Sequence, residues 1–378
     1  MRTLTPDEAR RFLLGHHSLR ADLPETGTAG LRRLLAERRC IQLDPLDRVG
    51  TNADLVALAR VAGIKRGDVY RALDAGHAFE HFAKERCLLP ASAFPYYRDQ
   101  AAETPWWRLS ERLDRLPAEL IADVLAEVTE RGPVAAEALT DRGRVEALDW
   151  AGWKSTSKAS TMALEVLWTR CQIVTCGRTE KGSRLYDVPH RALPAHHAAP
   201  VALDFARWAL CERVEAAGLL PRTGGPWWSM LSAVRTSPLP DLLVAEGLLE
   251  EVDVAGARTR YLAPAGFLDR TYPDDDGRMR ILGPLDPLLW FRPLVAQLWD
   301  FDYVWEVYKP AEKRQFGWYV CPLLHEGRLV GRFEGHVEGP PGDVSTLVVD
   351  GLWPEKGPER RFDKRAFNRA IARHAKAM

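Results

Sequence analysis

The stretch Cys171-Gln-Ile-Val-Thr-Cys-Gly-Arg-Thr-Glu-Lys-Gly-Ser-Arg-Leu-Tyr-Asp-Val188 carries the pattern that decides the fold. Its apolar first part, Cys171–Cys176, predicts a strand, and turn residues follow at Glu180–Ser183. Arg184–Val188 then predicts a returning strand. The whole stretch therefore indicates a small antiparallel hairpin.

Helices are expected ahead of this hairpin. Leu120, Val124 and Val128 recur at helical spacing in a segment that is broken at Gly132-Pro133. A short helix at Ala135–Leu139 and a longer one at Ala159–Trp168 follow. Three helices and a hairpin form the winged-helix plan, in which a helix and the hairpin wing can face DNA.

Other parts of the chain repeat this plan or depart from it. One further copy is expected in helices at Phe205–Ala216, Trp228–Val234 and Leu239–Glu246, with a hairpin of Leu249–Val254 and Arg258–Leu262. A less regular copy comes first, in a helix begun by Thr5-Pro6-Asp7-Glu8, helices at Ala29–Glu37, Asn52–Val61 and Lys65–Asp74, and an extended run at Phe79–Leu89. The last part predicts strands at Arg280–Leu282, Tyr303–Tyr308, Trp318–Leu324 and Leu329–Phe333, then a basic helix at Asp363–Lys376.

These patterns predict an α+β fold that is mainly helical, with tandem winged-helix modules and a small antiparallel β domain at the C-terminal end. We expect the module boundaries at residues 1–104, 105–198, 199–277 and 278–378.

Composition limits the function classes. The 378 residues carry a formal net charge of +0, so a nucleic-acid partner would need a locally basic face. Residues 1–13 are too charged for a signal peptide, and no apolar run is long enough to cross a bilayer. The 6 cysteines are scattered without a CxxC pair, which predicts reduced thiols in the cytoplasm. Neither a metal nor a cofactor is expected.

Ile41-Gln42-Leu43-Asp44-Pro45 is the stretch most suggestive of chemistry. It closes an apolar segment and predicts the end of a short strand, so Gln42 and Asp44 would project to the same side. An amide beside a carboxylate can hold a water molecule and stabilise a cation. Asp followed by Pro is also typical of a helix start, with Asp44 as N-cap. The same Leu-Asp-Pro-Leu recurs at Leu285–Leu288, so the local sequence leaves both interpretations open.

Longer matches resemble the AlkZ/AlkX (YcaQ-like) DNA glycosylases over nearly the whole chain. They lie at Gln42–Asp44, Asp54–Val56 with Arg60, Phe79-Glu80, Leu88–Pro90, Asp149–Trp153, Ala163–Leu167, Tyr186–Pro189, Arg191–Pro194, Leu282–Trp290, Asp300–Tyr303, Glu306–Val320 and Leu329–Arg332. The resemblance implies tandem winged-helix units that excise alkylated purines. The Gln-apolar-Asp signature of the AlkX-like branch implies that Gln42 and Asp44 are catalytic, and that N7-alkylated guanine and interstrand crosslinks are substrates.

The chain departs from that family near the signature. Phe82-Ala83-Lys84 stands where AlkX-like members often have Trp-Ala-His, and Thr51 and Ala53 replace basic or imidazole side chains. These departures bear on the lesion range and on the DNA contacts.

The expected chemistry is simple hydrolysis. An N7-alkylated purine is already cationic and needs no proton to leave, so one carboxylate suffices. Asp44 would stabilise the oxocarbenium-like transition state and take a proton from the attacking water, while Gln42 would orient the water or the carboxylate. With no lysine nucleophile assigned, we expect a monofunctional glycosylase that leaves an intact abasic strand.

Affinity for double-stranded DNA must come largely from phosphate contacts. The basic residues predicted to make them are Lys84, Lys154, Lys158, Lys181, Arg184, Lys313 and Arg314. We expect a monomer that is cytoplasmic and associated with the nucleoid.

The alternative is a non-enzymatic winged-helix DNA-binding protein or regulator. No dimerisation helix or coiled-coil heptad supports it. A metal- or nucleotide-dependent enzyme is disfavoured, because the chain has no P-loop, dinucleotide fingerprint or spaced metal ligands.

Overall fold

The computed structural model describes residues 2–101, 108–148, 156–339, 346–357 and 361–378. Within these ranges the chain has 14 α-helices and several small, mostly antiparallel sheets, which confirms the expected fold class. Its contacts divide it into two compact units. Unit 1 comprises residues 1–69, 82–87 and 209–378, and unit 2 comprises residues 70–81 and 88–208. The division into four modules stays a prediction.

Unit 1 contains the candidate catalytic segment and the C-terminal sheet. Its helices are α1 (Pro6–His16), α2 (Gly27–Arg38), α3 (Asn52–Leu58), most of α10 (Phe205–Ala217), α11 (Ser232–Thr236), α12 (Leu239–Ala245), α13 (Arg292–Trp299) and α14 (Lys364–Ala377). Its strands are β1 (Arg2–Leu4), β2 (Ile41–Gln42), β10 (Leu220–Pro221), β11 (Leu249–Val254), β12 (Tyr261–Pro264), β13 (Arg280–Ile281), β14 (Cys321–His325), β15 (Arg328–Glu338) and β16 (Thr346–Pro354).

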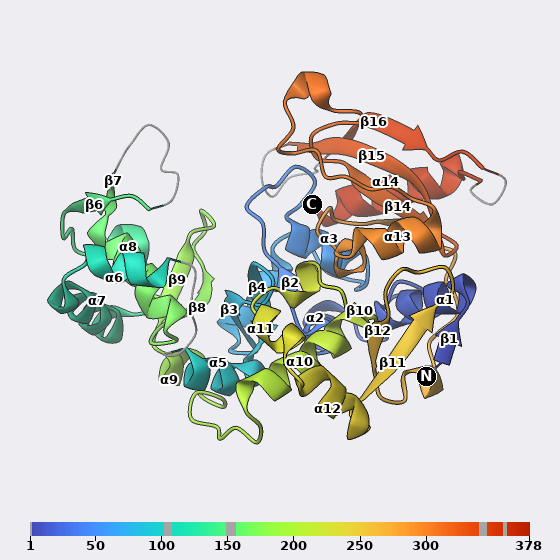
Figure 1. Cartoon of the computed structure of the whole chain (residues 1–378). Coiled ribbons are helices and arrows are strands. Elements are labelled where there is room, and N and C mark those ends of the chain that lie inside the picture. Colours follow the sequence, from blue (N-terminus) through green and yellow to red (C-terminus); the bar gives the residue numbers. More distant parts are fainter. Residues whose placement is uncertain (1, 102–107, 149–155, 340–345, 358–360) are drawn as a thin grey trace. The chain divides into compact units, whose positions relative to one another are not determined.

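Two sheets organise unit 1. One has the order β1-β11-β12-β10, with β1 parallel to β11 and the other pairs antiparallel. The other is the antiparallel sheet β13-β14-β15-β16, and helix α14 packs against it at the red end of Figure 1. Buried apolar side chains of α1, α13 and the first sheet form one core, and those of the second sheet and α14 form another.

The helix ends follow the capping chemistry in the sequence. The Thr5 hydroxyl accepts the backbone N–H of Glu8, and the Glu8 carboxylate accepts the backbone N–H of Thr5 in return, so α1 begins with a complete capping box. Asp363 caps α14 by accepting the backbone N–H groups of Arg365 and Ala366. Both helix starts were expected.

Unit 2 holds the hairpin from which the sequence analysis began. Its helices are α4 (Arg71–Asp74), α5 (Phe94–Gln100), α6 (Leu109–Arg115), α7 (Ala118–Arg131), α8 (Ala159–Thr169) and α9 (Pro189–Ala192). Its strands are β3 (Ala78–Phe82), β4 (Arg86–Pro90), β5 (Val134–Ala135), β6 (Arg144–Glu146), β7 (Thr156–Lys158), β8 (Val174–Arg178) and β9 (Arg184–Asp187), of which β3 and β4 reach into residues 82–87 of unit 1. The hairpin β8–β9 is antiparallel, as expected.

A buried carboxylate organises the interior of unit 2. Glu80 is fully buried and forms ion pairs with Arg178 and Arg184, whose Nε lies 3.3 Å from Glu80 Oε2. The Trp168 indole N–H donates to the Glu80 carbonyl (2.9 Å), and His81 stacks on the same indole. Strand β3, helix α8 and the hairpin β8–β9 are joined by these contacts.

Three predicted elements are wrong. The expected helix at Ala135–Leu139 is instead β5 and a 3₁₀ turn, because Val134 and Ala135 pair with β9. The run Phe79–Leu89 is a hairpin that reverses at residues 83–85. Tyr303–Tyr308 contains no strand, since its polar groups bond elsewhere: Tyr303 donates to the Val320 carbonyl, and Glu306 accepts backbone N–H groups of a later loop. Strand β16 was not expected.

Candidate active site

The candidate catalytic residues lie at the end of β2, in unit 1. Strand β2 ends at Gln42, and the backbone N–H of Leu43 donates to the Arg86 carbonyl (2.9 Å), which ties this segment to the tip of the β3–β4 hairpin. Asp44 therefore stands in the loop after the strand rather than on it. The alternation of side chains along a strand, from which the sequence analysis argued, does not extend to Asp44.

Asp44 does not begin a helix. The next helix, α3, starts at Asn52 and is capped by Thr51. Asp44 Oδ1 accepts the backbone N–H of Leu46 (2.9 Å), which stabilises a local turn. The helix-cap interpretation is therefore wrong for this residue.

The surroundings of Asp44 favour a reactive carboxyl group. Burial raises its pKa above the ordinary value, while the Leu46 N–H and the charge of Lys84 act in the opposite direction. The Asp44 charge also contributes to raising the pKa of the Tyr319 phenol, after burial and Cys321. Tyr319 is itself buried on the C-terminal sheet side of unit 1. Asp44 thus interacts electrostatically with Lys84 and Tyr319.

Asp286, the aspartate of the second Leu-Asp-Pro-Leu, has a different environment. It also accepts a backbone N–H two residues later, from Leu288 (3.0 Å), but it is fully buried and makes a bidentate ion pair with Arg60 at 2.7 and 2.9 Å. Asp286 is therefore neutralised by a structural partner. Asp44 is only half-buried, and in the described part of the chain no cation forms an ion pair with it.

Gln42 is fixed through its backbone and its side chain. Its carbonyl accepts a hydrogen bond from Asn52 Nδ2 (2.9 Å), and Asn52 Oδ1 accepts the backbone N–H of Leu285 (3.1 Å). The side-chain oxygen of Gln42 accepts a hydrogen bond from Lys84 Nζ (2.7 Å). Gln42 is buried, so the amide has a defined orientation.

Lys84 comes to the site from the tip of the β3–β4 hairpin. Two side chains hold this tip: Ser229 Oγ donates to the Lys84 carbonyl (2.6 Å), and Arg213 donates to the Ala83 carbonyl (2.5 Å). The Lys84 ammonium lies 4.9 Å from the ring centroid of Trp290. Burial lowers the pKa of Lys84 below its ordinary value.

Trp290 forms the aromatic wall beside the ammonium. Its indole N–H donates to the Leu285 carbonyl (2.8 Å), and its ring centroid is 4.2 Å from that of Trp227. The sequence analysis assigned no role to Trp227 or to Tyr319. Their places depend on segments far apart in the chain, and no local pattern indicates them.

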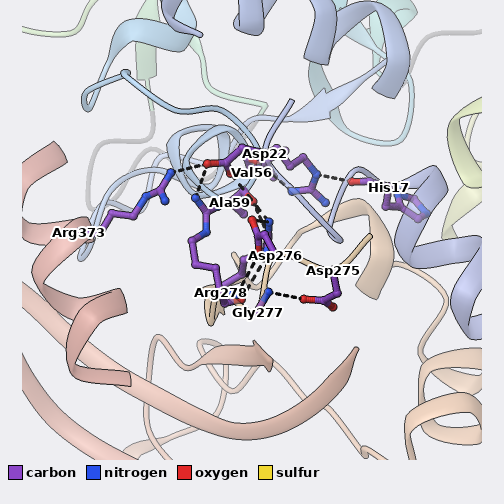
Figure 2. A network of polar contacts seen from close by, with 11 residues as sticks. His17, Asp22, Val56, Ala59, Asp275, Asp276, Gly277, Arg278 and Arg373 are labelled. Carbon is purple, nitrogen blue, oxygen red and sulfur yellow. Dashed lines mark hydrogen bonds and ion pairs between the residues drawn. The ribbon is translucent and has the colours of Figure 1, made fainter. Parts of the chain in front are cut away.

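Helix α3 carries Asn52 at one end and is held by arginines at the other. Arg278 and Arg280 both donate to the Ala59 carbonyl (3.0 Å each). Figure 2 shows Asp22 accepting from Arg278 and Arg373, at 2.6 and 2.7 Å. Asp276 accepts a bidentate contact from Arg280. This charged network fixes the end of α3 opposite Asn52.

Comparisons with known proteins identify the family and the fold of the chain. The family model described as DNA glycosylase AlkZ-like matches residues 31–377. The chain belongs to the AlkZ-like DNA glycosylase family. The solved structure of Streptomyces sahachiroi DNA glycosylase AlkZ is similar in fold, with a TM-score of 0.58 and 18% sequence identity, covering 100% of this chain and 97% of that chain. Membership makes this protein a DNA glycosylase, a hydrolase that acts on N-glycosyl bonds.

The basic residues predicted to contact DNA have different environments in this structure. Lys84 lies against Gln42. Lys158, Lys181 and Lys313 are exposed. Arg184 is paired with Glu80, and Arg314 donates to the Lys309 carbonyl (2.8 Å). Lys154, together with the Asp149–Trp153 motif, lies outside the described residues.

The described residues also bear on metal binding and on membrane insertion. No group of three or more potential metal ligands occurs among them. None of their helices is both long and apolar enough to cross a membrane.

Proposed function

We propose that Asp44 and Gln42 catalyse hydrolysis of the N-glycosidic bond of cationic N7-alkylated purines in double-stranded DNA. The observation that carries this proposal is the contrast between two aspartates in the same tetrapeptide: Asp286 is neutralised by Arg60, whereas Asp44 keeps a half-buried carboxylate beside Gln42. A carboxylate of this kind stabilises an oxocarbenium-like transition state and accepts a proton from water.

The reaction is monofunctional in this proposal. Lys84 Nζ is hydrogen-bonded to Gln42 Oε1, and in this proposal it does not attack the sugar, so no Schiff base forms. Water is then the nucleophile, and the product is an intact strand with an abasic site. Applied to each N7-linked guanine of an interstrand crosslink, the same hydrolysis would release the two strands. The protein would act as a monomer on cytoplasmic, nucleoid DNA.

The test is single-turnover excision of N7-methylguanine, read as abasic sites. Asp44→Asn keeps the shape of the side chain and removes its charge. We therefore expect the excision rate to fall about a hundredfold or more, with DNA affinity retained. Gln42→Ala should cost less, because Gln42 orients rather than neutralises charge.

Asp275→Asn is the matched control. Asp275 Oδ1 also accepts a backbone N–H two residues later, from Gly277 (2.8 Å; Figure 2), and Asp275 is exposed. Its rate should equal that of the parent protein. If Asp44→Asn lowers only the thermal stability and leaves the rate per folded molecule normal, Asp44 is a turn residue and the proposal is wrong.

A further inference from the structure

Lys84 is the one group at the candidate site that hydrolysis of a cationic base does not use. Its Nζ lies 2.7 Å from Gln42 Oε1 and 4.9 Å from the centroid of Trp290. The hairpin tip that carries it is anchored on both sides of the side chain, at the carbonyls of Ala83 and Lys84. This ammonium is therefore held at a fixed position beside a proposed catalytic residue.

The Lys84 ammonium has more N–H donors than its contact with Gln42 uses. It carries three N–H bonds, and Gln42 Oε1 takes one of them. Trp290 offers the ammonium a ring face but no acceptor lone pair, and its own N–H is committed to Leu285. The remaining N–H bonds can reach a group that enters the site next to Gln42.

Burial, rather than the charged neighbours, favours Lys84 as an acid, because Cys87, Glu85 and Cys40 raise its pKa and only Arg292 adds to the lowering. Burial lowers the pKa of Lys84, which makes the ammonium a better proton donor than an exposed lysine. The groups that face it are Asp44 and Cys40 from the β2 segment, Glu85 and Cys87 from its own hairpin, and Arg292 from α13. In general acid–base catalysis, Asp44 would serve as the base for water and Lys84 as the acid for the leaving group.

We propose that Lys84 is a general acid that protonates the departing base, and that it extends the reaction to uncharged lesion purines. The inference rests on the proposed function, since it assumes that Asp44 and Gln42 hydrolyse the glycosidic bond. An uncharged purine leaves as an anion unless a proton arrives as the bond breaks. A cationic N7-alkylated purine carries that activation already, so Lys84 matters to it much less.

The step balances without a further reactant. As the bond between the sugar C1′ and the purine nitrogen breaks, its electron pair stays on the base, and a proton passes from Lys84 Nζ to a ring nitrogen of that base. Water adds to C1′ and gives a proton to Asp44. The proton on Asp44 then returns to the Lys84 amine directly or through solvent. The net reaction is hydrolysis to a neutral free base and an abasic site.

Ethenoadenine, N7-methylguanine and undamaged DNA test the proposal in single-turnover reactions across a range of pH. The parent protein should release ethenoadenine with a bell-shaped pH profile, whose alkaline limb lies below the ordinary pKa of lysine. Lys84→Met removes the proton and should lower ethenoadenine release about a hundredfold. It should lower N7-methylguanine release by much less. The rate of N7-methylguanine release divided by that of ethenoadenine release should therefore rise at least about tenfold.

Lys84→Arg is the matched variant. It keeps the positive charge and the donors, but a guanidinium does not give up its proton. Lys84→Arg should therefore fail to restore ethenoadenine release, whereas a role in binding alone would let it restore the rate.

Several results would overturn the inference. If the parent protein releases N7-methylguanine but not ethenoadenine, it does not act on uncharged lesions, and this inference fails while the proposed function still holds. An equal loss for both lesions in Lys84→Met would make Lys84 a structural or binding residue. A borohydride-trapped complex that disappears in Lys84→Met would make it a nucleophile. If the parent releases neither lesion, the proposed function fails together with this inference.

Discussion

At the scale of single residues, burial and two neighbouring groups have opposite effects on the pKa of Asp44. Burial raises its pKa, and the Leu46 N–H and the Lys84 ammonium favour the ionised form. In the proposed mechanism, hydrolysis of a cationic base needs Asp44 as a carboxylate. The rate must therefore fall as the pH falls through the pKa of Asp44 in the folded protein, and that pKa lies above the ordinary value for aspartate.

A pH profile of N7-methylguanine release measures this directly. We expect the acid limb of the parent profile at a higher pH than an exposed aspartate would give. Lys84→Met should move the limb to still higher pH, because it removes a charge that favours the carboxylate. A limb that stays in place in Lys84→Met would show that the two side chains do not interact.

The residues differ in how far the sequence could identify them. Gln42 and Asp44 form a continuous motif, and the family resemblance singles them out. The helix-cap alternative for Asp44 could be excluded only with the structure, because Leu43–Leu46 and Leu285–Leu288 are the same tetrapeptide. The two aspartates differ in burial and in the partner Arg60, which pairs with Asp286. The contact of Lys84 with Gln42 joins residues on different elements, and no local pattern predicts it.

At the scale of elements, helix α3 links the site to the rest of unit 1. Asn52 at its start holds the Gln42 carbonyl, and Arg60 just beyond its end holds Asp286. The Arg60 side chain is fully buried, and it also donates to the carbonyls of His17 and Val56, both labelled in Figure 2. One buried guanidinium thus joins α1, α3 and the segment that precedes Trp290.

Arg60→Met should be strongly destabilising. It leaves the Asp286 carboxylate buried without its cation, and breaking a buried pair in this way typically costs about 3–5 kcal/mol. Arg33→Met is the control, because Arg33 pairs with Glu25 and Glu37 on the surface, where such contacts are worth about 1 kcal/mol or less. Urea unfolding of the two variants compares them. If both variants lose the same free energy of unfolding, the buried Arg60–Asp286 pair does not stabilise unit 1 more than a surface pair does.

The elements were predicted best where local chemistry decides them. The capping box at Thr5, the hairpin β8–β9 and helix α14 follow from residues that are neighbours in the chain. Ala135–Leu139 has helix-forming residues, but Ala135 joins β5 by pairing with β9, some fifty residues later, and a 3₁₀ turn follows. Tyr303–Tyr308 looks like a strand, yet tertiary hydrogen bonds hold it in an irregular form. Tertiary partners overrode propensity in both segments.

At the scale of the whole molecule, the formal net charge of +0 gives no overall attraction to DNA. Binding must then depend on locally basic surface, which exposed lysines such as Lys158, Lys181 and Lys313 can supply. Arg184 differs from them because Glu80 already neutralises it. Of these four residues, the three exposed lysines can contact phosphates, whereas Arg184 pairs with Glu80 inside unit 2.

DNA affinity measured against salt concentration tests this division. Log affinity should fall steeply and linearly with log salt, and Lys181→Ala should reduce the slope by about 0.9, the contribution of one phosphate contact. Arg184→Ala should instead lower thermal stability, because it removes one of the cations that pair with the buried Glu80 carboxylate, and the salt slope should stay at the parent value. A flat dependence in the parent would exclude a phosphate-binding surface. A reduced slope in Arg184→Ala without loss of stability would show that this arginine exchanges Glu80 for the DNA backbone.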